Sequence, residues 1–409
     1  MNTSLNSFDV TIIGGGAIGA LFALSLVHDC FLKKTPSYKI ALIDQTPLET
    51  LLNPATDGRT FALTTSAYSL LQKLGIWEKL DAKASPILNI LVTEGAHQEG
   101  LHYDHESVQK PFGYIVESSL LRKEIFLKLQ SSKQITFLTP TKLDSLKREK
   151  SHMALYLQDG TCLTTRLLVG ADGKNSKVRE LLGFEVFHFP YPQHALVCHF
   201  AHPYPHRGWS IEAFYPEGPF AILPLNGNAH FPHQSGLVWT STPGEIKELS
   251  VMAEEDFNKR LSEKLDLHRY GFPRLISKRW TYPLSAHVTP TFISERTVLL
   301  GDAAHSIHPV AGQGLNLGIR DVEALSSEIS KALSLGLDPG SSLFLENFQK
   351  SRRLDILSLL GITHGLIRLF SNHSKILKFL RENGLLVIDS LPSLKRFFVN
   401  EAMGRAPNA

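Results

Sequence analysis

One stretch near the start of the chain restricts its fold more than any other. Hydrophobic pattern and glycine placement predict a strand, a turn, a helix and a second strand, at residues 8–13, 14–19, 20–28 and 39–43. Within the turn, Gly14, Gly16 and Gly19 fall in the G-x-G-x-x-G register that allows close approach to a pyrophosphate, and Asp44 ends the second strand, where an acid can bind ribose hydroxyls. We therefore predict a dinucleotide-binding βαβ unit, with a generic buried βαβ unit as the alternative.

A second glycine-rich stretch, GDAAHSIHPVAGQGLNLGIRD at 301–321, has a related layout. The apolar run 297–300 predicts a strand before it, and a helical pattern takes over at Leu315. A loop of glycine and proline before a helix start brings backbone N–H groups against an anionic ligand. An ordinary strand–loop–helix connection is the alternative.

The chain between these stretches predicts mixed structure. We expect helices at 62–80 and 118–130, and strands at 89–94, 135–138, 153–157 and 162–169. A third motif, GADGKNSKVR at 170–179, directly follows the last of these strands. Residues 184–283 are aromatic, proline-rich and alternating, which predicts an antiparallel sheet that lines an apolar space.

Composition excludes several classes of protein. The 409 residues are too many for one compact core, so two domains, or one large core with an insertion, are expected. A net charge of +3 gives no indication of nucleic-acid binding. Three widely spaced cysteines fit a reducing cytosol rather than a disulfide framework. The apolar run 10–27 is interrupted by glycines at the predicted βα turn, so we interpret it as buried strand and helix rather than a membrane span.

Together, the three motifs resemble those of the class A FAD-dependent aromatic hydroxylases, the group related to p-hydroxybenzoate hydroxylase, and the resemblance covers nearly the whole chain. HPVAGQGLNLGIRD at 308–321 is similar to the signature of the ubiquinone-biosynthesis hydroxylases. DGRTFAL at 57–63 and GPFAILPL at 218–225 resemble the 2-polyprenyl-6-methoxyphenol hydroxylases of that group most closely.

The resemblance implies a fold and a division of the chain. The fold class is α/β (mixed α+β), with a Rossmann-like FAD-binding domain, a discontinuous antiparallel-sheet substrate domain and a helical C-terminal region. The FAD-binding domain would comprise residues 1–75, 117–183 and 285–345. The substrate-binding domain would comprise 76–116 and 184–284, and the helical region 346–409.

The resemblance also implies roles for single residues. Gly14, Gly16 and Gly19 approach the FAD pyrophosphate, and Asp44 holds the adenosine ribose. Pro309 packs near the reactive face of the flavin. The remaining implied contacts with FAD are those of Arg59 with the phosphates or flavin edge, Asp172 in the DG motif, Asp302 with the ribityl chain, and the backbone of Gly312, Gly314, Leu315 and Asn316 with the flavin N1–C2=O edge.

Two features leave alternatives. Many relatives carry Asn or Gln where Ser118 follows the strand expected at 113–117, and we take Arg122, one helical turn on, as a substitute contact with FAD. His305 and His308 have no carboxylate or third ligand at metal-ligand spacing, so no metal is expected. For His308 a general-base role stands beside packing or backbone hydrogen bonding.

The implied activity is hydroxylation of a polyprenylated phenol in ubiquinone biosynthesis, with FAD, NAD(P)H and O2. Reduced flavin is anionic at N1, which a helix N-terminus stabilises. Oxygen then adds at flavin C4a, and the hydroperoxide has to be kept from water, which gives the apolar residues of 184–283 a role as pocket wall. No second nucleotide-binding pattern is visible in the sequence, so NAD(P)H is expected to dock transiently.

Other hypotheses stay open. One is a different FAD-dependent oxidoreductase of the same fold, although the W-x-W-x-I-P motif of halogenases is missing from the sequence. Another is a non-catalytic FAD-binding subunit of a ubiquinone-biosynthesis complex. The basic, amphipathic segment 370–409 would either contact a membrane or a partner, or cap the FAD-binding domain. We expect a cytoplasmic location, peripheral at the inner face of the membrane if the segment binds lipid.

Overall fold

The computed structural model describes residues 6–33, 38–95, 100–107, 109–309 and 312–370, and its strands form three sheets. The first has eight strands in the order β18-β19-β11-β1-β2-β8, with β10 and β9 added beside β11. β1 pairs in parallel with β2 and β11, as the βαβ prediction requires. The strands are β1 Asn6–Ile13, β2 Ile40–Ile43, β8 Ile135–Leu138, β9 Leu143–Arg148, β10 Met153–Leu157, β11 Cys162–Gly170, β18 Ile293–Ser294 and β19 Thr297–Leu299.

The second sheet has nine strands in the order β20-β17-β12-β15-β14-β13-β5-β6, with β16 beside β12. It is antiparallel as predicted, apart from the parallel pair β13–β5. Its strands are β5 Asn89–Glu94, β6 Leu101–Asp104, β12 Phe187–Ala201, β13 Trp209–Tyr215, β14 Gly218–Asn226, β15 His233–Ser241, β16 Arg274–Leu275, β17 Trp280–Val288 and β20 His305–Ser306. A three-stranded sheet contains β3 Thr60–Thr64, β7 Gly113–Glu117 and β4 Ser85–Ile87.

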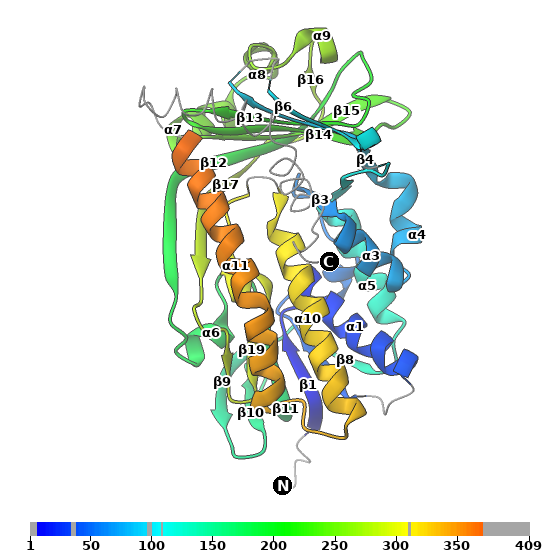
Figure 1. Cartoon of the computed structure of the whole chain (residues 1–409), viewed down its shortest axis with the longest axis vertical. Helices are drawn as coiled ribbons and strands as arrows, with labels where there is room; N and C mark the ends of the chain where they lie inside the picture. The colour runs from blue at the N-terminus through cyan, green and yellow to red at the C-terminus, as the bar shows by residue number, and fades with distance from the viewer. Residues whose placement is uncertain (1–5, 34–37, 96–99, 108, 310–311, 371–409) are drawn as a thin grey trace.

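Helices cover the first sheet and the outer face of the second. α10 and α11 run side by side along the molecule, with α1 next to α10 (Figure 1). The helices are α1 Ala17–Lys33, α2 Leu48–Leu52, α3 Thr65–Lys73, α4 Trp77–Leu80, α5 Ser118–Gln130, α6 Lys177–Leu181, α7 Pro243–Val251, α8 Glu254–Ser262, α9 Leu267–Tyr270, α10 Gly314–Ser334 and α11 Ser342–Phe370, with 3-10 turns η1 Asp81–Lys83, η2 His105–Ser107 and η3 Gly301–Ala303. None of the described helices is both long and apolar enough to cross a membrane.

One predicted element is wrong in its first part. The helix expected at 62–80 begins as strand β3, which pairs with β7, and becomes helical only after Thr64. The Thr64 hydroxyl accepts a hydrogen bond from the Ala67 N–H and so caps α3. The pairing with β7 is non-local and has no signature within the segment itself. The basic segment predicted at the C-terminal end lies, beyond residue 370, outside the described residues.

Candidate active site

The register of the first sheet brings the three glycine motifs to one edge. Ile13 of β1 pairs with Ile43 of β2 and with Gly170 of β11, and Gly170 pairs with Leu299 of β19, all in parallel. The residues that follow these strand ends therefore lie side by side. In open parallel sheets, ligands bind outside the carboxyl ends of the strands. The edge is thus the candidate active site, assembled from segments almost 300 residues apart.

The glycine turn after β1 combines tight packing with an open face. At Gly14, whose φ is +107°, a Cβ atom would lie 2.3 Å from the Ala171 carbonyl oxygen, and at Gly19 a Cβ would lie 2.0 Å from the Gly14 oxygen. Gly16 is exposed, and a Cβ there would meet no atom within 4 Å. The first two glycines are thus required by the fold, whereas the space above Gly16 is left free for a ligand.

Asp44 faces this turn. One carboxylate oxygen accepts a hydrogen bond from the Gly15 N–H at 2.6 Å, and the other accepts one from the Thr46 N–H at 2.7 Å. A carboxylate can accept about four hydrogen bonds, so lone pairs remain for ribose hydroxyls.

Asp172 holds the second motif against α6. Its Oδ2 accepts hydrogen bonds from the Lys177 and Val178 N–H groups at 2.6 and 3.2 Å. Its Oδ1 is buried and has no hydrogen-bond partner in the described part of the chain. Ser176 caps α6 by accepting from the Arg179 N–H. The unsatisfied oxygen is one of the features that an additional ligand at this edge would explain.

Arg179 joins the second motif to the third. This buried guanidinium donates to the Lys174 carbonyl at 2.6 Å and to the Ala303 carbonyl at 2.8 Å. His287 Nε2 lies 3.0 Å from the Asp302 carbonyl oxygen. Burial and the Arg179 charge lower the pKa of His287 to about 4, so its ring is neutral. The same Nε2 lies 3.2 Å from Arg179 Nη1, so it either accepts from Arg179 or donates to the Asp302 carbonyl, according to its tautomer. These contacts join residues up to 124 positions apart, so no local sequence pattern predicts them.

The Asp302 side chain is exposed, yet protein surrounds it closely enough that burial raises the pKa of its carboxyl group. Such a group lies in a recess rather than on a convex surface. Asp302 thus points a carboxyl group, polar but poorly hydrated, into the edge formed by the three motifs.

The loop before α10 and the helix start follow. Pro309 is exposed, and the Gly312 N–H donates to the Pro309 carbonyl at 2.9 Å, which closes a turn. α10 begins at Gly314, so the N–H groups of Gly314 and Leu315 belong to its first turn, where no acceptor exists within a helix. The positive end of this long helix therefore faces the site.

Asn316 fixes that helix start. Its side-chain NH2 donates to the Ala62 carbonyl at 2.8 Å, and its oxygen accepts from the Thr64 N–H at 3.1 Å. These bonds satisfy the amide within the protein and tie α10 to β3. The Asn316 side chain is therefore a positioning group, while its backbone N–H belongs to the first turn.

A buried ion network on the interior side of this loop holds it to α10 and α11. Asp321 Oδ2 accepts from His305 Nε2 at 2.6 Å and from the Gly301 N–H at 3.1 Å, and Oδ1 accepts from Arg352 Nε at 2.7 Å. Burial alone would raise the pKa of Asp321, but His305 and Arg352 hold it at about 2. The partners are 16 to 31 residues from Asp321 along the chain, a separation that no local pattern reveals.

His308 lies inside the protein. It is fully buried, its ring meets Tyr191 edge-on with centroids 4.8 Å apart, and burial lowers its pKa to about 4. This placement favours the packing role over the general-base role. Among the described residues, no cluster of three or more His, Cys, Asp or Glu side chains is placed to hold a metal ion.

The two arginines expected at the cofactor share one carboxylate. Arg59 binds Asp57 through Nε and a terminal nitrogen at 2.9 and 2.6 Å, and Arg122 lies 3.8 Å from the same carboxylate. The Ser118 hydroxyl also reaches Asp57, at 3.5 Å. The departure at Ser118 thus belongs to a polar group centred on Asp57, which places both arginines beside β3.

A glycine turn with open space above Gly16, an acid with free lone pairs and a helix N-terminus at one sheet edge are the features of a dinucleotide-binding site. Residues 7–353 match the profile of the FAD binding domain family, so the match covers most of the chain. The chain belongs to this family and is an FAD-dependent monooxygenase of the aromatic hydroxylase type. FAD is therefore its cofactor.

Two named relatives are similar over most of their length. The chain is 37% identical to ubiquinone hydroxylase UbiL of Rhodospirillum rubrum, over 97% of this chain and 89% of that protein. It is 29% identical to the 3-demethoxyubiquinol 3-hydroxylase of Escherichia coli, over 97% and 98% of the two chains. Among solved structures, the probable FAD-dependent monooxygenase pqsL of Pseudomonas aeruginosa has the same fold, with a TM-score of 0.74 at 22% identity, over 90% of this chain and 97% of that one.

Proposed function

We propose that this enzyme hydroxylates a polyprenylated phenol in ubiquinone biosynthesis, with NAD(P)H as reductant and O2 as oxidant. The observation that carries the proposal is the assembly of the three motifs at the carboxyl edge of the first sheet, in a chain whose relatives are ubiquinone hydroxylases. An extended antiparallel sheet with many apolar residues suits a prenylated ring.

At this edge, Gly14, Gly16 and Gly19 would approach the FAD pyrophosphate, and Asp44 would bind the adenosine ribose. Asp302 would bind the ribityl chain. Arg59, Arg122 and Asp172 would make further contacts, the last through its unsatisfied Oδ1.

FAD supplies the redox chemistry when bound: it takes electrons from NAD(P)H and passes them to O2. The protein supplies charge and position. The Gly314, Leu315 and Asn316 N–H groups at the start of α10 would stabilise negative charge on the flavin ring, and Gly312 shapes the turn before them. Exposed Pro309 would pack at the reacting face, whereas His308 supports the loop from inside.

We further propose the domain division expected from sequence, with FAD bound by residues 1–75, 117–183 and 285–345 and substrate by 76–116 and 184–284. We also propose that the basic segment 370–409 contacts a membrane that holds the lipid substrate. Cosedimentation with anionic liposomes, with and without residues 371–409, tests the second point; equal binding of both forms would contradict it.

The function itself is tested with purified protein, FAD, NADPH and a short-chain prenylphenol. We expect a hydroxylated phenol by mass spectrometry, with one atom of 18O2 in the product. Reduction and reoxidation of the flavin without that product would count against hydroxylation of prenylphenols. Protein that binds FAD but cannot be reduced would instead support a non-catalytic subunit.

A further inference from the structure

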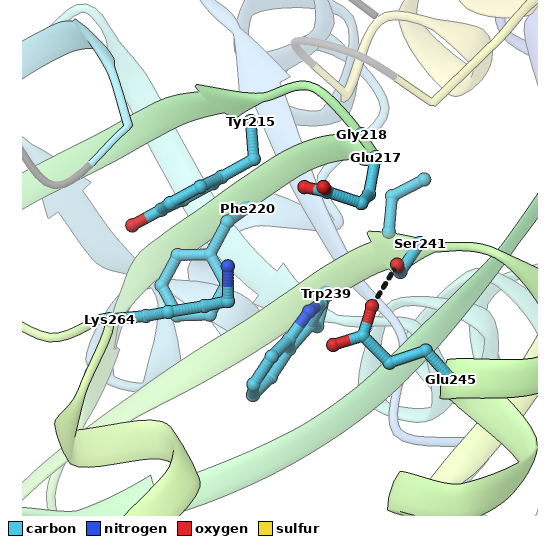
Figure 2. A pocket seen from close by; sticks show the side chains of 9 residues that line it. Tyr215, Glu217, Gly218, Phe220, Trp239, Ser241, Glu245 and Lys264 are labelled. Carbon is cyan, nitrogen blue, oxygen red and sulfur yellow. Dashed lines mark hydrogen bonds between the residues drawn. The ribbon is translucent and has the colours of Figure 1, made fainter.

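The two faces of β13 have different surroundings. Ile211 and Ala213 belong to the apolar cluster under α7 and α8, and Tyr215 packs against it. On this outer face, Lys264 lies over the Tyr215 ring at 3.5 Å, in a small cavity that Figure 2 shows. The cavity of about 10 Å³ has room for roughly one water molecule, so the outer face offers no ligand site there. Glu212 alternates with these residues and therefore points to the opposite, inner face.

The inner face looks toward the candidate active site. Glu212 is in register with Ala221, Val238, Val197 and Trp280 on the successive strands of the sheet, so their side chains share one face. The ring of Trp280 lies against Gly58, where a Cβ atom would be 2.1 Å from the indole.

Two further contacts show the same orientation. His199, on the same face of β12, has its Nε2 3.2 Å from the Gly58 carbonyl oxygen. The Tyr282 hydroxyl, on the same face of β17, donates to the Asp57 carbonyl at 2.7 Å. This face of the sheet therefore packs on the loop that carries Arg59.

A series of contacts connects the face that carries Glu212 with Gly312, which precedes α10. The partner of Glu212 on β5 is Val92, which packs with Leu223 and Ala62 on the apolar cluster of the small sheet. Ala62 in turn meets Gly312, where a Cβ atom would be 3.3 Å from the Ala62 Cβ. Glu212 is therefore on the face of the second sheet that packs toward β3, and β3 in turn meets Gly312.

Nothing in the described part of the chain pairs with this carboxyl group. No hydrogen bond or ion pair to the Glu212 side chain is present among the described residues, and solvent still reaches it. Burial alone raises the pKa of Glu212 to about 7. The titratable groups on nearby elements are Glu94 on β5, Tyr103 on β6 and Arg59 beside β3, and none of them contributes to that shift.

A half-buried carboxyl group without a protein partner costs stability, and the fold gains nothing from it. We infer that Glu212 is a catalytic residue that accepts the phenolic proton of the substrate, an inference that rests on the proposed function. A carboxylate that is poorly hydrated and unpaired is a stronger base than one in water, and it is half deprotonated near neutral pH.

The step balances. The phenolic O–H bond breaks, its proton passes to Glu212, and the electron pair moves into the ring. The ring carbon forms a bond to one oxygen atom of O2, which takes up a proton, while the other atom leaves as water. NAD(P)H supplies two electrons and one proton, and the solvent supplies two protons, one of which the ring gives back. The ring carbon then releases its hydrogen as a proton, and Glu212 returns its own proton to the phenolic oxygen.

The test compares the FAD-loaded wild type with Glu212→Gln, Glu212→Asp and, as a matched control, Glu217→Gln, an exposed carboxyl group just after β13. For Glu212→Gln we expect a loss in kcat of roughly 10²–10⁴-fold with a smaller change in KM. The wild-type kcat should rise with pH through about 7, and this limb should vanish in Glu212→Gln. Glu212→Asp should retain part of the activity and the rise of kcat with pH. Glu217→Gln should retain the full activity and the full pH dependence.

A second readout is independent of turnover. A carboxyl group whose pKa is raised by folding destabilises the native state as pH rises from its ordinary 4.5 to about 7. The Tm of Glu212→Gln should therefore not show this loss of stability over the same pH range. Wild-type kcat and pH profile in Glu212→Gln would overturn the assignment while the proposed function stands. Absence of hydroxylated product from the wild type would overturn the proposed function and the assignment with it.

Discussion

At the residue scale, the positions of a local motif could be predicted from the sequence, whereas a single polar position within a strand could not. Gly14, Gly16, Gly19 and Asp44 could be predicted because their spacing is local and dictated by the ligand. Glu212 could not, because in an alternating strand such as WSIEAFY the polar position normally faces water. Here both faces of the sheet are covered, so that position faces the interior.

Gly16 allows a direct test of the cradle. Gly16→Ala should fold with unchanged stability, because a Cβ there meets no protein atom within 4 Å. It should nevertheless bind FAD about tenfold more weakly, a loss of about 1.4 kcal/mol, because the added methyl group occupies space that the ligand needs. Flavin fluorescence titration measures the Kd. Gly244→Ala, equally open but on α7, is the control and should leave FAD affinity unchanged.

Asp321 predicts a specific dependence of stability on pH. Its pKa is held at about 2 in the native state, against an ordinary 3.8. A depressed pKa stabilises the fold above the ordinary value, and this contribution, roughly 2 kcal/mol, disappears as pH falls from about 4 to about 2. Urea unfolding across this range should show the advantage of wild type over Asp321→Asn shrinking toward low pH. A constant difference would contradict the account.

At the element scale, the sequence predicted isolated elements well and their partners poorly. α5 at Ser118–Gln130 and the strands at Ile135–Leu138 and Met153–Leu157 have the predicted bounds, because each has a strong local pattern. The second half of β3 was predicted as helix, since its pairing with β7 comes from residues about 50 positions away. The tie between α11 and the loop before α10 was likewise invisible, because it depends on a salt bridge between separate helices.

Substitution of Arg352 removes the salt bridge to Asp321. Arg352→Leu should destabilise the protein by about 3 kcal/mol, because removal of one partner leaves the Asp321 carboxylate buried and poorly compensated. FAD affinity should fall as well, since Asp321 also receives the Gly301 N–H at the site. Chemical unfolding and FAD titration are the measurements. Arg353→Leu, one residue on and exposed, should change neither; a similar loss there would point to a general effect on α11.

At the scale of the whole molecule, the proposed FAD site draws on segments from most of the chain. The first sheet, the loop at β3 and the start of α10 meet at the same edge, so bound FAD would hold them together in addition to their own contacts. The sequence indicated this convergence only through the resemblance of its motifs. The packing of the second sheet on the loop at Asp57 and Gly58 could not be predicted from the sequence, because its contacts join residues 141 and 225 positions apart.

Removal of FAD should therefore lower the stability of the whole protein. At a free FAD concentration of about 100 times Kd, the stabilisation is about 2.7 kcal/mol by mass action. The Tm should rise with FAD concentration in the wild type and much less in Gly14→Ala, whose Cβ would collide with the Ala171 carbonyl. A Tm that does not depend on FAD in the wild type would contradict a cofactor site of this kind.

The contact between Trp280 and Gly58 has a consequence for spectroscopy. The indole is one of four in the chain, and it lies at the joint between the second sheet and the loop that leads to Arg59. Tryptophan emission overlaps the absorption of oxidised flavin, so light absorbed by Trp280 can be transferred to the cofactor. The fluorescence lifetime of Trp280 can be isolated by comparison with a Trp280→Phe sample. It would report the distance between the second sheet and the flavin during turnover.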